Sequence, residues 1–350
     1  MRTVANVSVL SCVLVCASSV ALAAEGRTPI YAPGTVITSS GKYILTRSLS
    51  GPGIQINASV VDLDLNGFEV EANGGVAIQV AANEVRIHNG TLTNASVAID
   101  GGVTRAVIED LRITTATIAG IRLNSVNNFM IRRVLITSTG DGIRIINGSP
   151  SHGRIESCQL AGGSGRGISI DGASSSSIVD NNVTYFTDEG IYVGSCDACL
   201  VSRNTVTQSG GLGAIYLSGV GRGVALTGNT ATANRSHGMH IATGARSTVV
   251  ENNVLTENGS GPGGGDGLRF EGSTGKVVGN TMDANNGVGL NFTSTSYWVA
   301  YGRNSARNNS GTGTTPPCTG TPTLVYPESC NNGSSNTTFG DNLIPGPPLF

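Results

Sequence analysis

The chain has 350 residues, of which 50 are glycine, 13% are charged and 5% are aromatic. Average globular chains have roughly 7% glycine and about 25% charged residues, so the composition excludes a charge-rich helical domain or coiled coil. The glycines follow no three-residue period, which excludes collagen, and abundant Val, Ile and Leu exclude a disordered chain. The net charge of −2 gives no basis for nucleic-acid binding. An all-β chain with many turns is predicted.

The N-terminus is predicted to be a signal peptide that spans residues 1–24. Arg2 precedes a mostly small and apolar stretch, and Ala21-Leu22-Ala23 fits the small-x-small cleavage pattern. We therefore expect a secreted or periplasmic protein. No membrane span is expected after signal removal, because no other segment approaches about 18 apolar residues. Residues 25–53 are predicted to form an N-terminal β lead-in that caps the following domain.

From residue 54 onward a short motif recurs, in which a small residue precedes the pattern apolar–x–apolar. The first apolar residue of each motif is here called its anchor, and the anchors are 21 to 29 residues apart. The eleven anchors are Ile54, Ile78, Ile99, Ile121, Ile143, Ile168, Ile191, Ile215, Met239, Leu268 and Leu290. The period of two predicts strands with one buried face. A repeat of about 24 residues is too short for a propeller blade.

Two further short strands are expected between successive anchors, and from mid-chain the third strand opens with asparagine. These asparagines are predicted to be Asn181, Asn204, Asn229, Asn252, Asn280 and Asn304. Stacked asparagine side chains can hydrogen-bond from coil to coil. Three strands per repeat and an asparagine ladder predict a right-handed parallel β-helix of about eleven coils over residues 54–310. A Pro-rich capping tail is expected at 311–350.

The mature chain has five cysteines, and export permits disulfides. Cys196 and Cys199 form a CxxC that we expect to be a local disulfide in a loop, because no second CxxC or helix start accompanies it. Cys318 and Cys330 flank a Pro-rich segment and are expected to pair. Cys158 falls in an apolar register and is predicted to be a buried free thiol.

This pattern resembles the right-handed parallel β-helix superfamily over about residues 30–310. The stretches ITSSGKYIL at 37–45 and VDLDLNGF at 61–68 are especially similar. The superfamily includes pectate lyases, polygalacturonases, alginate epimerases and carbohydrate-binding exported proteins. The resemblance therefore implies the fold and a glycan partner, but no enzyme family's catalytic motif is present in this sequence.

The middle residue of each anchor motif should face solvent and form one column along the molecule. In chain order this column holds Gln55, Gln79, Asp100, Arg122, Arg144, Ser169, Tyr192, Tyr216, His240, Arg269 and Asn291. The chain has only eight tyrosines and four histidines, yet Tyr192, Tyr216, His237 and His240 fall on three adjacent coils. This clustering makes the column the candidate site.

The chemistry of the column suits an acidic polysaccharide, because tyrosine stacks on sugar rings and arginine binds carboxylates. For a lyase or epimerase, His240 or Tyr216 is predicted to remove the proton beside a uronate carboxylate, which Arg269 or Arg144 neutralises. The predicted substrate-binding residues are Arg122, Arg144, Tyr192, Glu189, His237 and Asp266. Hydrolysis is disfavoured, since Glu189 and Asp266 are three coils apart, roughly 14 Å.

Several alternatives stay open. Asp141 and Asp266 lie in Gly-Asp-Gly turns, where aspartate commonly caps the backbone. An arginine stripe on another face is either a solvated surface or a binding surface for a sulfated or acidic glycan; its members are Arg86, Arg112, Arg132, Arg133 and Arg154. His237 and His240 with Asp266 give only weak support for a metal site. No resident cofactor or metal is therefore predicted, although calcium is left open.

Three functions remain: an exported polysaccharide-binding protein with lyase or epimerase chemistry, a non-catalytic glycan-binding, adhesion or envelope-scaffold module, and a periplasmic metal-handling accessory protein. The expected partner is a polysaccharide or glycoconjugate, and the sequence does not indicate the oligomeric state.

Overall fold

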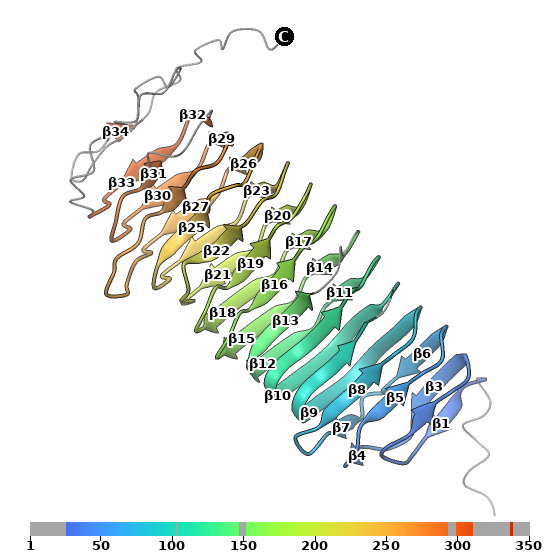
Figure 1. The fold of residues 1–350 in the computed structure, drawn as a ribbon. Helices are drawn as coiled ribbons and strands as arrows, with labels where there is room; N and C mark the ends of the chain where they lie inside the picture. The colour runs from blue at the N-terminus through green and yellow to red at the C-terminus, as the bar shows by residue number, and fades with distance from the viewer. Residues whose placement is uncertain (1–25, 103, 147–151, 293–298, 311–336, 339–350) are drawn as a thin grey trace, which may run out of the picture.

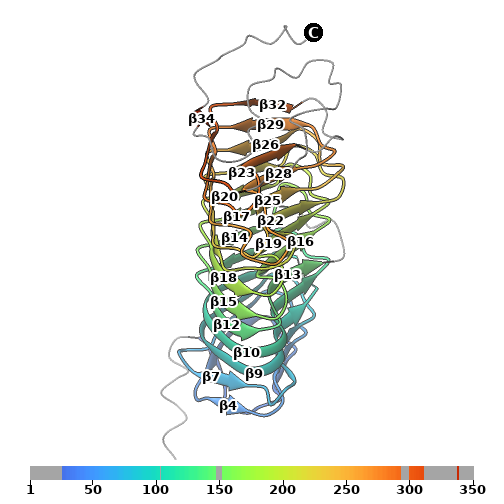
Figure 2. The ribbon, with the colours of Figure 1, turned by 90° about the vertical axis from the view of Figure 1, so that its left-hand side faces the viewer.

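The computed structural model describes residues 26–102, 104–146, 152–292, 299–310 and 337–338. All the regular elements in these ranges are β-strands, and they form one elongated solenoid (Figure 1). Each coil contributes one strand to each of three parallel stacks, which Figure 2 shows from the side. The all-β class and the parallel β-helix of about eleven coils are as predicted.

The first-strand stack contains the anchor residues. It consists of β2 (Val36–Ile37), β5 (Ile54–Ile56), β8 (Val76–Val80), the end of β9 (Val85–Gly101), the end of β10 (Val107–Asn124), β13 (Asp141–Ile146), β16 (Ile168–Asp171), β19 (Ile191–Gly194), β22 (Gly213–Ser218), β25 (His237–Ile241), β28 (Leu268–Phe270) and β31 (Leu290–Phe292). All eleven anchors are register partners from coil to coil. The predicted repeat is therefore confirmed residue by residue.

The second-strand stack follows the anchors along each coil. It consists of β1 (Thr28–Ile30), β3 (Gly41–Leu45), β6 (Val61–Asp64), the starts of β9 and β10, β11 (Met130–Arg132), β14 (Arg154–Glu156), β17 (Ser177–Val179), β20 (Leu200–Ser202), β23 (Ala225–Thr227), β26 (Thr248–Glu251), β29 (Gly275–Val278) and β32 (Val299–Gly302).

The third-strand stack completes each coil. It consists of β4 (Leu49–Ser50), β7 (Glu69–Glu71), the middles of β9 and β10, β12 (Leu135–Thr139), β15 (Gln159–Gly163), β18 (Asn182–Phe186), β21 (Thr205–Thr207), β24 (Thr230–Thr232), β27 (Val254–Thr256), β30 (Thr281–Asp283) and β33 (Ser305–Arg307). A short antiparallel strand, β34 (Thr337–Thr338), pairs with β33 at the C-terminal end. This pairing covers part of the exposed edge of the last third strand.

The core fills the centre of the solenoid with the inward residues of all three stacks, and the anchors from Ile54 to Leu268 are fully buried. This packing requires a small residue before each anchor, and at Gly167 that residue must be glycine. A Cβ at Gly167 would overlap with the side chain of Val183 and the carbonyl oxygen of Gly190. Each coil therefore buries its apolar side chains against its own strands and the neighbouring coils.

The asparagine ladder is present, with one correction to the predicted members. Side-chain amides donate to the next Oδ1 at 2.9–3.0 Å through Asn181, Asn204, Asn229, Asn253, Asn280 and Asn304. The prediction of Asn252 was wrong, because that residue is exposed in a left-handed turn with φ of 55° while Asn253 points into the ladder. A second ladder, which the sequence analysis missed, runs through Asn234, Asn258, Asn285 and Asn309.

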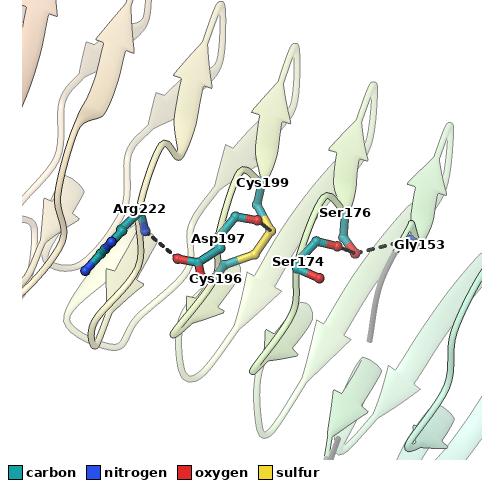
Figure 3. The surroundings of a disulfide bond; sticks show 7 residues. All are labelled: Gly153, Ser174, Ser176, Cys196, Asp197, Cys199 and Arg222. Carbon is teal, nitrogen blue, oxygen red and sulfur yellow. Dashed lines mark hydrogen bonds between the residues drawn. A yellow bond between two sulfur atoms is a disulfide. The ribbon is translucent and has the colours of Figure 1, made fainter. Parts of the chain in front are cut away.

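Cys196 and Cys199 form a disulfide in the turn between β19 and β20 (Figure 3). Asp197 between them accepts a hydrogen bond from the backbone N–H of Arg222 on the next coil, at 2.8 Å. Cys158 is a buried free thiol, and burial raises its pKa to about 12. The predicted Cys318–Cys330 pair and the signal peptide lie outside the described residues.

No helix that is long and apolar enough to cross a membrane occurs in the part of the chain that the structure describes.

Candidate functional site

The predicted column exists as one continuous ladder on the first-strand stack. The expectation that all its members face solvent was wrong for Ser169 and His240, which are buried, and most of the other members are half-buried. Its members, from Gln55 to Asn291, are register partners on successive coils. We call this column, together with the flanking residues Asp141, Arg166, Glu189, His237, Asp266 and Glu271, the first-strand face. Successive side chains along it are about 4.8 Å apart.

Three aromatic rings stand side by side on this face, and we call Tyr192, Tyr216 and His240 the ring row. They come from β19, β22 and β25 (Figure 1). The ring centroids of Tyr192 and Tyr216 are 5.8 Å apart, and those of Tyr216 and His240 are 5.0 Å apart. The guanidinium carbon of Arg166 lies 3.7 Å from the centroid of the Tyr192 ring, a cation–π contact. The row is thus held in a fixed geometry.

The predicted catalytic residues occupy three consecutive coils, because Tyr216 pairs in register with His240 and His240 with Arg269. Only 6% of His240 is exposed, and neither ring nitrogen makes a hydrogen bond within the described residues. Its Nε2 nevertheless lies 3.3 Å from Oε2 of Glu271. Burial lowers the pKa of His240, although the Glu271 carboxylate opposes this shift. His240 is therefore a neutral imidazole near pH 7.

Glu271 is a site residue that the sequence analysis missed. Its second carboxylate oxygen accepts a hydrogen bond from Nε of Arg269, two residues earlier. Burial alone would raise the pKa of Glu271, but Arg269 and His240 hold it below its usual value. The carboxylate therefore joins the candidate base to the candidate cation. The only sequence feature that could have indicated Glu271 is its position directly after the anchor strand Leu268–Phe270.

His237 and Asp266 form a second contact beside the ring row. The His237 ring centroid lies 5.3 Å from that of His240. The backbone N–H of Asp266 donates to Nδ1 of His237 at 2.8 Å, and the Asp266 carboxylate lies 3.5 Å from the same nitrogen. Burial lowers the pKa of His237 to about 4, and the nearby His240 and Arg269 add to the effect while Asp266 opposes it. His237 is therefore an acceptor rather than a cation.

Three carboxylates of the face hold the backbone of the next coil. Asp141 accepts from the N–H of Arg166 at 2.9 Å, Glu189 from Leu212 at 3.2 Å, and Asp266 from Val288 at 2.9 Å. Asp266 also accepts from the side-chain amide of Asn291 at 2.8 Å. These bonds support the alternative in which Asp141 and Asp266 cap turns.

The arginines of the face are paired with carboxylates. Arg122 binds Asp100 through two hydrogen bonds of 2.9 and 2.8 Å. Nη1 of Arg144 lies 3.3 Å from the Asp141 carboxylate. Arg166 donates through Nε to Glu189 at 2.8 Å. Arg122 and Arg144 also lie far from the predicted base, since Arg144 is four coils, roughly 19 Å, from His240.

The predicted arginine stripe is also an ion-paired network. Arg86, Arg132 and Arg133 converge on Glu109, whose side chain is almost completely buried. Burial alone would raise the pKa of Glu109, but Arg132 and Arg86 hold it below its usual value. Arg112 lies instead on the third-strand stack, in register with Leu135. The stripe therefore offers little free positive charge.

Within the described ranges, no three His, Cys, Asp or Glu side chains are placed to hold a metal ion together.

A profile of the family described as right handed beta helix region matches residues 96–255 and 166–344, which together cover more than half of the chain. The chain therefore belongs to this family of right-handed β-helix proteins. A search of curated proteins found no match to the sequence.

Several solved structures are similar in fold. The A-module of a mannuronan C-5 epimerase from Azotobacter vinelandii is 14% identical with a TM-score of 0.57, over 80% of this chain and 88% of that chain. A DFA-IIIase from Arthrobacter chlorophenolicus A6, in complex with GF2, is 14% identical with a TM-score of 0.56, over 81% and 89%. A double mutant of a periplasmic alginate epimerase is 13% identical with a TM-score of 0.50, over 78% and 77%. At identities this low, the similarity shows a shared fold and nothing further.

Proposed function

We propose that this protein is an exported β-helix that binds a polysaccharide along its first-strand face. The observation that carries the proposal is the ring row, in which Tyr192, Tyr216 and His240 follow one another at 5.8 and 5.0 Å on three adjacent coils. Tyr192 and Tyr216 are half-buried, so their rings can contact the C–H groups of sugars and their hydroxyls supply polar ends, while the buried His240 supports the end of the row. A linear array of rings matches a linear polymer better than it matches a compact ligand.

Neighbouring folds are consistent with this proposal. The similar structures include enzymes named for mannuronan and alginate and one bound to GF2. Export is supported by the predicted signal peptide and by the Cys196–Cys199 disulfide, since disulfides persist in oxidising compartments. We extend these features to the present chain as part of the proposal.

Lyase or epimerase chemistry is the second candidate function, because the adjacent His240, Tyr216 and Arg269 have the residue types that it needs. A neutral His240 is the form that accepts a proton. Two features oppose the reaction in this conformation. Both ring nitrogens of His240 are buried and therefore not accessible to a substrate proton, and Arg269 is already paired with Glu271. Binding is therefore proposed as the primary function.

The proposal is tested by affinity electrophoresis of the mature chain in native gels that contain single polysaccharides. Tyr192→Ala and Tyr216→Ala should each weaken binding by about 1 kcal/mol, roughly five-fold in Kd. Tyr31→Ala is the matched control, because Tyr31 is 64% exposed at the N-terminal end and lies outside the ring row. Equal binding by all three variants would contradict the proposal.

Catalysis is tested separately by incubating the protein with alginate and pectate and following the ultraviolet absorbance of an unsaturated product. Absorbance that depends on His240 would favour a lyase activity, whereas binding without product would favour a non-catalytic glycan-binding module. Epimerisation makes no unsaturated product, so the sugar composition of the alginate is compared by NMR before and after incubation.

A further inference from the structure

The charged groups of the first-strand face are arranged in pairs. Its four arginines, Arg122, Arg144, Arg166 and Arg269, each contact a carboxylate of the same face. The partners are Asp100, Asp141, Glu189 and Glu271. The expectation of an acidic polysaccharide depended on guanidinium groups that are free to bind uronates, and the structure pairs all four.

The balance of charge on the face is slightly negative. Four arginines stand against five carboxylates, the four partners and Asp266, which leaves one excess negative charge. His237 and His240 do not change this balance near pH 7, because burial lowers the pKa of both rings. A polymer with a carboxylate on every residue would therefore meet no attractive field along this face.

Binding a uronate carboxylate would also disrupt existing contacts. To form a bidentate pair that uses Nε of Arg269, it must displace Glu271, which would leave that carboxylate next to the bound uronate and to His240. Removing one partner from a partly buried ion pair is costly, because the remaining charge loses its compensation. The bidentate pair of Arg122 and Asp100 presents the same obstacle.

Sugar hydroxyls fit the paired groups without breaking them. A hydroxyl both donates and accepts, and a paired guanidinium or carboxylate keeps N–H groups or lone pairs for further bonds. The half-buried rings of Tyr192 and Tyr216 supply the stacking surface between these pairs, with Arg166 at the Tyr192 end and Arg269 next to the buried His240. The face thus combines apolar rings with balanced polar groups.

We infer that the first-strand face selects neutral, hydroxyl-rich polysaccharides and discriminates against polyuronates. This inference rests on the proposed polysaccharide binding and gives it a substrate class. It differs from the acidic polymer that the residue types alone suggested.

The experiment is affinity electrophoresis of the mature chain in gels with a neutral glucan, a neutral fructan, alginate or pectate, at low and high ionic strength. We expect retardation by a neutral polymer that salt leaves unchanged, and weaker or no retardation by alginate and pectate. Stronger binding of either polyuronate would overturn the inference while leaving the proposed function standing. Absence of binding to every polymer would overturn the proposed function itself.

Two variants test the reason for the preference. Glu271→Gln frees Arg269, and Asp100→Asn frees Arg122. Each should raise alginate affinity by roughly tenfold or more at low salt, because a charge-assisted hydrogen bond becomes available. Asp180→Asn is the matched control, since Arg203 and Asp180 form a similar bidentate pair in turns away from this face. If the site variants gain no more than the control, charge pairing does not set the preference.

Discussion

Oε2 of Glu271 lies 3.3 Å from Nε2 of His240 on the preceding coil. The same carboxylate accepts a hydrogen bond from Arg269. A single side chain thus links an imidazole to a guanidinium in the centre of the first-strand face. Since His240 has no hydrogen-bond partner among the described residues, Glu271 is the group that most directly controls its charge state.

Replacing Glu271 should therefore shift the titration of His240. Burial lowers the pKa of His240 and the negative charge of Glu271 raises it, so Glu271→Gln should lower the pKa further. The measurement is an NMR titration of the His240 ring. Glu84→Gln removes a carboxylate from the distant pair with Arg105 and should leave the midpoint unchanged. A higher midpoint in Glu271→Gln would contradict the assigned contact.

The stability of the fold should fall in mild acid because of His237. Its pKa is about 4 in the folded chain, against an ordinary value of 6.5. Between pH 6.5 and about 4, His237 is protonated in the unfolded chain but stays neutral in the folded chain. Stability is therefore fully present above pH 6.5 and decreases as the pH falls through this window, by up to about 3 kcal/mol.

His237→Asn tests this dependence, because an amide oxygen can accept the hydrogen bond from Asp266 but cannot titrate. The variant should lose less thermal stability than the wild type between pH 6.5 and 4, as followed by circular dichroism. The same slope in both proteins would show that His237 does not control this window.

The coil pattern could be predicted from the sequence because it depends on local and periodic features. Anchors such as Ile143 and Ile168 alternate with polar residues and recur at nearly constant spacing, so their register followed from counting. The second asparagine ladder was also visible in principle. Asn234 and Asn258 each lie five residues after a member of the first ladder, but no apolar pattern marks their positions.

The pairing of charges was harder to predict, because it depends on which side chains meet across coils. Asp100 and Arg122 are neighbours in the predicted column, and their ion pair could have been inferred from that order. Glu271 could not, since it lies outside the strand and its contacts depend on the path of the turn. The residue types of the face were therefore predicted correctly, whereas the availability of its arginines was not.

The asparagine ladder gives a direct test of the corrected register. Asn253→Ala should destabilise the protein strongly, because Oδ1 of Asn253 accepts from the backbone N–H and from one side-chain N–H of Asn229, both buried. Each unsatisfied group costs about 1–3 kcal/mol. Thermal denaturation should therefore show a clear loss of stability.

Asn252→Ala is the matched control at the adjacent residue. Asn252 is exposed and adopts a left-handed conformation, so alanine there should cost only about 1–2 kcal/mol from backbone strain. Equal melting temperatures for the two variants would mean that Asn253 is not the ladder member.

The Cys196–Cys199 disulfide should contribute modestly to stability, because it closes a very short loop. The chain-entropy relation gives about 2 kcal/mol for four residues.

The preceding coil holds Ala173 and Ser176 at the equivalent positions, since Ser174 pairs with Asp197 and Ser177 with Leu200. The hydroxyl of Ser176 accepts from the N–H of Gly153 and donates to the carbonyl of Ser174 (Figure 3). The double variant Cys196→Ala/Cys199→Ser copies this unbridged turn, so it should remain folded and melt only a few degrees lower by circular dichroism. Loss of the folded state would instead mean that the bridge is required to build the coil.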